Sequence, residues 1–176
     1  MRTRAICDAG VWLGQADGRR AGRRLLRSVG PGTLLLWDRG FQNVALVEAT
    51  EAREADFLGR LPATVAPLPL CALSNGTALV RLRASDYPRR RHGAHVVVRL
   101  IRCTLDDPQR PGHRVAHRLV TSLRDPAVAP ARDLILAYHR RWEIESALDE
   151  VKTHQCPAAP SAVASRSASS RRSTAC

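Results

Sequence analysis

The feature that most constrains the fold is a short apolar run at residues 33–37, Thr-Leu-Leu-Leu-Trp, which ends in Asp38. Such a run is typical of a central strand that is buried on both faces. An amphipathic helix is predicted over residues 42–55 and a further strand over residues 56–61, an order typical of strands joined by a crossover helix. The sequence therefore predicts an α/β fold in which Asp38 lies at the end of a strand.

Two roles for Asp38 fit this position. In α/β sheets ligands gather beyond the carboxyl ends of strands, so that a carboxylate here lies where a site is built. The same carboxylate is also placed to cap the helix predicted over residues 42–55. Gly40 permits the sharp exit of the chain in both cases. The residues alone do not separate a site from a helix cap.

A second pattern lies in the helix predicted over residues 131–153. Four of its side chains fall within an arc of about 60°, because each helical residue is rotated by about 100° from the last. These are Tyr138, Arg141, Glu145 and Lys152. The stripe is roughly 21 Å long and carries a carboxylate between cations, which suits an extended polyanion. An ordinary amphipathic helix with a few surface charges is the alternative.

Together the two patterns resemble one known family. The stripe has the spacing Tyr-x2-Arg-x3-Glu-x6-Lys, and Asp38 stands upstream in Leu-Leu-Leu-Trp-Asp-Arg-Gly-Phe. Both match the signature of the insertion-sequence-four family of bacterial DDE transposases, and the resemblance extends over residues 5–154. It implies an RNase H-like core with a β-rich insertion between the strand of the second catalytic Asp and the helix of the catalytic Glu.

By this resemblance Asp38 and Glu145 are catalytic residues and metal ligands. The family uses three carboxylates, two Asp and one Glu, to hold two Mg²⁺ ions for in-line attack of water or a 3′-hydroxyl on a phosphodiester. Arg141 and Lys152 would grip the backbone of the transposon end. Tyr138 would support them by stacking or by a hydrogen bond.

Two departures from the family pattern bear on activity. The first Asp of the family lies on an opening strand, which we expect upstream of this chain, and Asp8 lies too close to the start to belong to that strand. Residues 154–176 have Val163 as their single large aliphatic residue, a composition that predicts disorder where family members continue into helices. These departures indicate a truncated copy that is inactive alone, in which Mg²⁺ binding is weak or absent.

The alternation typical of strands predominates in residues 62–125. Strands are predicted at residues 77–83, 94–102 and 114–120. Residues 76–124 hold 11 arginines and 3 acidic residues, which gives a net charge of +8. An arginine-rich sheet offers guanidinium groups to DNA phosphates, and solvated strand faces are the alternative.

These patterns divide the chain into four segments. We expect a partial RNase H-like core at residues 1–61 and the β-rich insertion at residues 62–125. The core helix with the Tyr-Arg-Glu-Lys motif follows at residues 126–153, and a disordered tail at residues 154–176.

The first segment also contains a basic helix, predicted over residues 18–29. Asp17 is placed to cap it, and Gly-Pro-Gly at residues 30–32 closes it. One side of this helix can pack while the other faces solvent or phosphate, with a solvated face as the preferred interpretation. Its basic residues are Arg19, Arg20, Arg23, Arg24 and Arg27. A strand is predicted before it, over residues 3–12.

Composition indicates the class of partner. The chain has 28 basic and 16 acidic residues, a net charge of +12, which favours nucleic acid or an anionic surface. Its five cysteines form no CxxC pair and its histidine pairs have no matching cysteines, so neither disulfides nor zinc are expected. Because no signal peptide or membrane-length apolar run is visible, we expect a cytoplasmic protein with no membrane partner.

Three functions remain open at this point. The first is a transposase-like DNA-binding protein for DNA transposition by metal-dependent cleavage and strand transfer, inactive alone because the first catalytic Asp is missing. The second is a non-catalytic DNA-binding remnant or an inhibitor of full-length transposase. The third is a structural fragment with no selected role. Double-stranded DNA at transposon ends is the partner expected of the first two, and full-length transposase is a further partner of the second.

Overall fold

The computed structural model describes residues 7–8, 18–38, 43–83, 95–104, 114–141 and 153. The residues up to Arg141 form one unit, and the later residues belong to another. The elements described all lie in the first unit. In chain order they are α1 (Gly18–Leu25), η1 (Leu26–Ser28), β1 (Leu34–Trp37), α2 (Val44–Glu51), β2 (Asp56–Arg60), β3 (Leu68–Ala72), β4 (Ala78–Arg83), β5 (His95–Thr104), β6 (Ala116–Thr121) and α3 (Ala131–His139).

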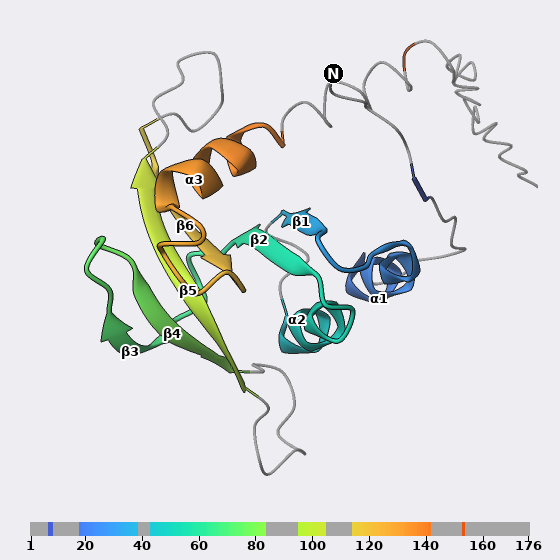
Figure 1. Ribbon diagram of the computed structural model, residues 1–176, viewed down its shortest axis with the longest axis horizontal. Helices are drawn as coiled ribbons and strands as arrows, with labels where there is room; N and C mark the ends of the chain where they lie inside the picture. The colour runs from blue at the N-terminus through green and yellow to red at the C-terminus, as the bar shows by residue number, and fades with distance from the viewer. Residues whose placement is uncertain are drawn as a thin grey trace, which may run out of the picture. The chain divides into compact units, whose positions relative to one another are not determined.

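The described strands form a six-stranded mixed sheet in the order β1-β2-β6-β5-β4-β3 (Figure 1). β1 and β2 are parallel, with Trp37 opposite Gly59, and the other neighbouring strands are antiparallel. This arrangement confirms the α/β class and the parallel pair joined by α2. The strands of residues 62–125 do not form a sheet of their own, because β6 pairs with β2 and continues the sheet.

The residue that caps the N-terminus of helix α2 is Asn43 and not Asp38. The side chain of Asn43 accepts a hydrogen bond of 2.7 Å from the backbone N–H of Leu46, which satisfies one of the free donors of the first turn. The helix predicted over residues 42–55 is therefore present in shortened form. Because Asn43 supplies the cap, the alternative in which Asp38 caps this helix is wrong.

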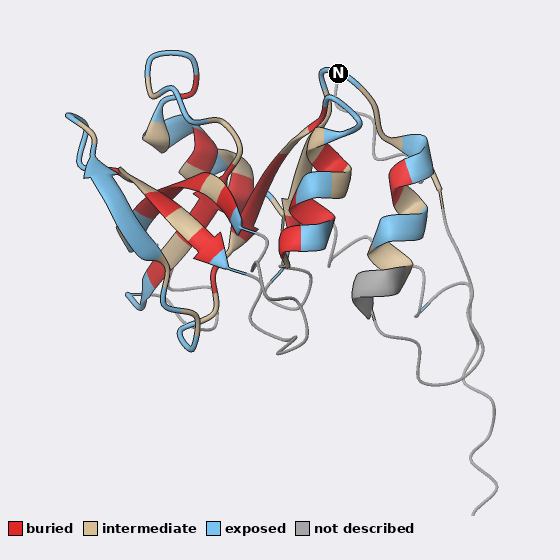
Figure 2. Cartoon of the chain, turned by 90° about the horizontal axis from the view of Figure 1, so that it is seen from below, coloured by how far each residue is buried: buried red, intermediate tan, exposed pale blue. Residues whose placement is uncertain are grey.

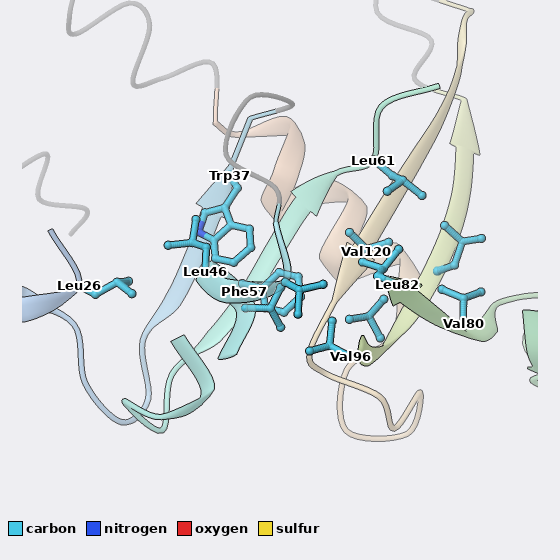
Figure 3. Close-up of a cluster of buried hydrophobic side chains, with 13 residues drawn as sticks. Leu26, Trp37, Leu46, Phe57, Leu61, Val80, Leu82, Val96 and Val120 are labelled. Carbon is cyan, nitrogen blue, oxygen red and sulfur yellow. The ribbon is translucent and has the colours of Figure 1, made fainter. Parts of the chain in front are cut away.

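One side of the sheet packs against α1 and α2 through a large apolar cluster (Figure 3). At its centre the rings of Trp37 and Phe57 stack with their centroids 4.5 Å apart and an angle of 7° between planes. A Cβ atom added to Gly59 would lie 3.2 Å from the Cβ of Trp37, so the glycine leaves room for the indole. We call this the α2 side of the sheet.

The other side of the sheet is covered by α3. Successive strand residues point to opposite sides, and so Leu58, the neighbour of Phe57, packs here with Ile101 and Leu119. From α3, Leu134 and Tyr138 complete this second cluster. Figure 1 shows α3 on the opposite side of the sheet from α2. We call this the α3 side.

A fully buried arginine joins α3 to the sheet. Arg99 of β5 donates from Nε to the hydroxyl of Thr77 at 3.0 Å, and from Nη1 to the carbonyl of Ala129 at 2.6 Å. Thr77 immediately precedes β4, and Ala129 lies just before α3. Burial lowers the pKa of Arg99, while the charge of Asp125 acts in the opposite direction. These two hydrogen bonds connect the segment before α3 with β5 and with the residue before β4.

The helix predicted over residues 131–153 differs from the one observed. α3 ends at His139, and the N–H of Arg141 donates to the carbonyl of Tyr138 at 3.0 Å, a three-residue spacing that tightens the last turn. Thr153 is again helical, and residues 142–152 lie outside the described part of the chain. A continuous α-helix through residues 140–141 was therefore a wrong prediction.

The basic helix near the start is confirmed. α1 and η1 together cover Gly18–Leu25 and Leu26–Ser28, and Leu26 is buried against the α2 side. The strand predicted over residues 3–12 is not formed at Cys7 and Asp8, the two of its residues that are described. Across the described residues no helix is long and apolar enough to cross a membrane.

Candidate functional site

Asp38 follows the last residue of β1 and lies at the carboxyl end of the parallel pair. Its side chain is 49% exposed. By strand alternation it shares the α3 side with Leu34 and Leu36, which pack against the second cluster. The predicted position of Asp38, directly after the end of a strand, is therefore the one observed.

Arg141 lies next to Asp38 although the two residues are far apart in sequence. One of its terminal nitrogens, Nη2, is 4.0 Å from Oδ1 of Asp38, and the arginine side chain is 17% exposed. At this distance, with an exposed carboxylate, the ion pair is weak. The structure thus brings together two residues that the sequence patterns assigned to the site, and it leaves the carboxylate open to solvent.

Tyr138 lies beneath Arg141 and is 7% exposed. The guanidinium carbon of Arg141 is 5.6 Å from the centroid of the tyrosine ring, within the range of a cation–π interaction. Burial raises the pKa of Tyr138, and the nearby charge of Arg141 partly opposes that rise. A ring in this position can support Arg141 by stacking, whereas its own surface is largely covered.

Arg60 is a cation of this region that the sequence patterns missed. It is the last residue of β2, and it follows Gly59 just as Asp38 follows Trp37 in the paired strand β1. By alternation with Leu58 it is on the α3 side. Its charge lowers the pKa of both Tyr138 and Cys103 against the larger effect of burial. The signal available in the sequence was its place at the end of the strand beside that of Asp38.

Asp8 is held in a different arrangement. Its carboxylate accepts hydrogen bonds from Nε and Nη2 of Arg27, at 2.8 and 2.6 Å, and from the hydroxyl of Ser28 at 2.6 Å. The side chain of Asp8 is 14% exposed. These contacts connect Asp8 to the end of the basic helix.

The arginines of the sheet do not form a single cationic surface. Arg81 and Arg83 alternate with Val80 and Leu82 of the α2-side cluster, and so they belong to the α3 side. Arg102 and Arg118 are paired across β5 and β6 on the α2 side. Arg99, by contrast, is part of the interior. The positive charge predicted for this stretch is therefore divided between both sides of the sheet and its core.

The chemistry of the described residues fits a hard cation only in part. Asp38 offers exposed carboxylate oxygens, the ligand type that Mg²⁺ prefers. Glu145 and Lys152 lie outside the described residues. Within the ranges that are described, no group of three or more His, Cys, Asp or Glu side chains is close enough to hold a metal ion. Of the two predicted metal ligands, Asp38 is thus the one that the described residues include.

Asp38, Arg60 and Arg141 thus lie on one side of a mixed α/β sheet, at the carboxyl end of its parallel strands β1 and β2. The transposase DDE domain family matches the chain over residues 2–158. The chain therefore belongs to the transposase DDE domain family, and the resemblance to DDE transposases is confirmed at that level. No curated protein matches the chain.

Proposed function

We propose that this protein binds double-stranded DNA at transposon ends, with the DNA backbone against Asp38, Arg60 and Arg141. The observation that carries the proposal is that Arg141 lies within 4.0 Å of Asp38, beside Arg60 on the same side of the sheet. Membership of the transposase DDE domain family makes DNA the natural substrate. The more specific assignment, to the insertion-sequence-four family, rests on the spacing from Tyr138 to Lys152.

Each described residue has a distinct part in this proposal. Arg141 and Arg60 bind neighbouring phosphates, because guanidinium groups donate two hydrogen bonds to a phosphate in one plane. Tyr138 holds the plane of Arg141 from below through the stacking contact. Asp38 repels the phosphate until its charge is neutralised. In this arrangement binding and chemistry share one location but depend on groups of opposite charge.

Asp38 and Glu145 would hold Mg²⁺, which supplies activation of the attacking oxygen and stabilisation of the leaving oxygen. The family pattern uses three carboxylates, and only these two positions match it. Mg²⁺ binds tightly only where enough anionic oxygens converge in octahedral geometry. We therefore propose that the chain binds DNA but does not cleave it alone. Because Asp8 is held by Arg27 and Ser28, a non-catalytic DNA-binding role, including inhibition of full-length transposase, is the second candidate.

Fluorescence anisotropy of a labelled transposon-end duplex, measured over a series of salt concentrations, tests the binding. Each phosphate contact contributes about −0.9 to the slope of log affinity against log salt, so Arg141→Gln and Arg60→Gln should each reduce the slope by about 0.9. Arg132→Gln, on the exposed side of α3, is the matched control and should change the slope least. Equal effects of all three variants would show that only net charge matters.

A nicking assay with Mg²⁺ or Mn²⁺ tests the catalytic part. We expect no cleavage of a duplex that the chain binds. Addition of the chain to a reaction of an intact transposase on the same ends should lower the yield if the second candidate is correct. Metal-dependent cleavage by this chain, unchanged in Asp38→Ala, would overturn both the assignment of Asp38 and the expected inactivity.

A further inference from the structure

The basic helix is a cationic surface that the candidate site does not use. Arg23, Arg24 and Arg27 are exposed, and the sequence of α1, Gly-Arg-Arg-Ala-Gly-Arg-Arg-Leu, contains no acidic residue. Arg27 is paired with Asp8. Arg23 and Arg24 make no ion pair or hydrogen bond with a side chain anywhere in the described structure. The outer surface of α1 therefore carries positive charge that nothing in this part of the chain neutralises.

The inner surface of the same helix is already occupied. Leu26 is buried in the α2-side cluster, and Ala21, Gly22 and Leu25 are half-buried (Figure 2). An amphipathic helix that binds a membrane must insert its apolar surface among the lipids. Here that surface packs on the protein, so only the arginines are free to meet a partner. This arrangement favours a polyanion with charges on its outside over a lipid bilayer.

The position of α1 separates its arginines from the candidate site. Leu26 packs on the α2 side of the sheet, whereas Asp38 and Arg60 lie on the α3 side. A DNA segment held at Asp38 is therefore separated from α1 by the sheet. The roughly three helical turns of α1 and η1 extend over roughly 16 Å, a length that faces on the order of nine phosphate charges of a duplex.

We propose that α1 and η1 bind the backbone of a second duplex segment while the first is held at Asp38. The inference rests on the proposed function, since the first segment is the one assigned to Arg141 and Asp38. Arg23 and Arg24 are the principal contacts of this second segment, because Arg27 forms an ion pair with Asp8. Such contacts recognise the phosphate backbone and not the base sequence. Two surfaces on opposite sides of a sheet allow one chain to hold two DNA segments together.

A bridging assay tests the proposal. The full chain is mixed with two duplexes that carry a donor and an acceptor fluorophore, and energy transfer is measured together with the mass of the complex by sedimentation equilibrium. We expect two duplexes for each chain. The double variant R23Q/R24Q should keep one duplex and lose the energy transfer, because the phosphate contacts that hold the second duplex are removed. The control R83Q/R132Q removes the same charge from the α3 side and should still bridge.

The outcomes separate this inference from the proposed function. Bridging by R23Q/R24Q at the wild-type level, or a single duplex bound by the wild-type chain, would contradict the proposal that α1 and η1 bind a second duplex segment. Neither result would affect the proposed binding at Asp38. Loss of binding to phosphatidylserine vesicles by R23Q/R24Q, with bridging unchanged, would overturn the second duplex segment in favour of a membrane surface. If R23Q/R24Q loses all DNA binding while R141Q behaves as the wild type, the proposed function fails and α1 is the DNA surface.

Discussion

The two sides of the sheet are built on different principles. The buried residues of the sheet that face α1 and α2 are apolar, with the stacked rings of Trp37 and Phe57 at the centre. The side that faces α3 mixes apolar residues with buried polar ones, among them Arg99, His117 and Thr121. Asp38 and its arginines lie at one end of this second side. The apolar side thus forms the larger hydrophobic cluster, while the α3 side combines a smaller cluster with buried polar groups and with Asp38, Arg60 and Arg141, the residues that we propose to contact DNA.

The polar residues of the α3 side make specific contacts and do not merely fill space. The hydroxyl of Thr121 donates to the carbonyl of Phe57 at 2.6 Å, and Arg99 donates to Thr77 and Ala129. A buried polar group without a partner is costly, so each of these contacts restricts the position of the neighbouring segment. Of these contacts, the one from Arg99 to Ala129 reaches the segment that leads into α3, the helix that carries Tyr138.

The largest effect on the free energy of unfolding is expected from a substitution in the apolar cluster of the α2 side. Phe57→Ala removes a fully buried ring from its stack with Trp37 and leaves a cavity, which should lower the free energy of unfolding by about 3–5 kcal/mol. Urea unfolding followed by circular dichroism measures this change. A loss below about 1 kcal/mol would show that the α2 side does not form the principal core.

A smaller effect is expected at the buried cation of the α3 side. Arg99→Met keeps the volume of the side chain but removes its two hydrogen bonds, and should cost about 1–3 kcal/mol. Arg102→Met, an exposed neighbour on the same strand, is the control and should change stability by less than about 0.5 kcal/mol. Hydrogen exchange should also become faster in the segment from Asp125 to α3. An unchanged rate of hydrogen exchange in this segment would show that Arg99 does not position α3.

The smallest effect is expected at Tyr138, and it depends on pH. Burial raises its pKa in the folded state, so the unfolded chain releases the proton first and stability falls as pH rises above about 10, the ordinary tyrosine value. Tyr138→Phe removes this loss and should leave stability near pH 7 within about 0.5 kcal/mol. Urea unfolding at pH 7 and at pH 10.5 measures both. A steeper fall in the variant than in the wild type would contradict the burial of the hydroxyl.

Sequence patterns predicted the α2 side well because apolar periodicity is a local property. The strand before Asp38, the crossover helix and the parallel strand of Phe57 all followed from it. The prediction that the first of these is a central strand buried on both faces was wrong, because β1 lies at the end of the described sheet and most of its residues are half-buried. β3 was missed, because Leu68–Ala72 is an exposed edge strand that contains Pro69 and shows no alternation between buried and exposed residues. A strand of this kind is defined by its pairing with β4, which no local pattern reveals.

The candidate site was predicted in part, for a related reason. Asp38 and Arg141 were found through their spacing within motifs, and their proximity agrees with the resemblance that joined those motifs. Arg60 was missed because its nearness to Asp38 depends on the register between β1 and β2. Arg99 was counted among the cations of a DNA platform, although the structure buries it completely. Residue type alone did not distinguish a surface guanidinium from a structural one.

The most direct test of the account compares two substitutions of opposite sign at the site. In metal-free buffer a duplex phosphate beside Asp38 is repelled by the carboxylate, and two charges about 4 Å apart in water interact by about 1 kcal/mol. Asp38→Asn should therefore bind a transposon-end duplex about fivefold more tightly than the wild type, while Arg141→Gln should bind it more weakly by a similar factor. Unchanged affinity in both variants, measured by anisotropy at one salt concentration, would contradict the claim that DNA lies against Asp38.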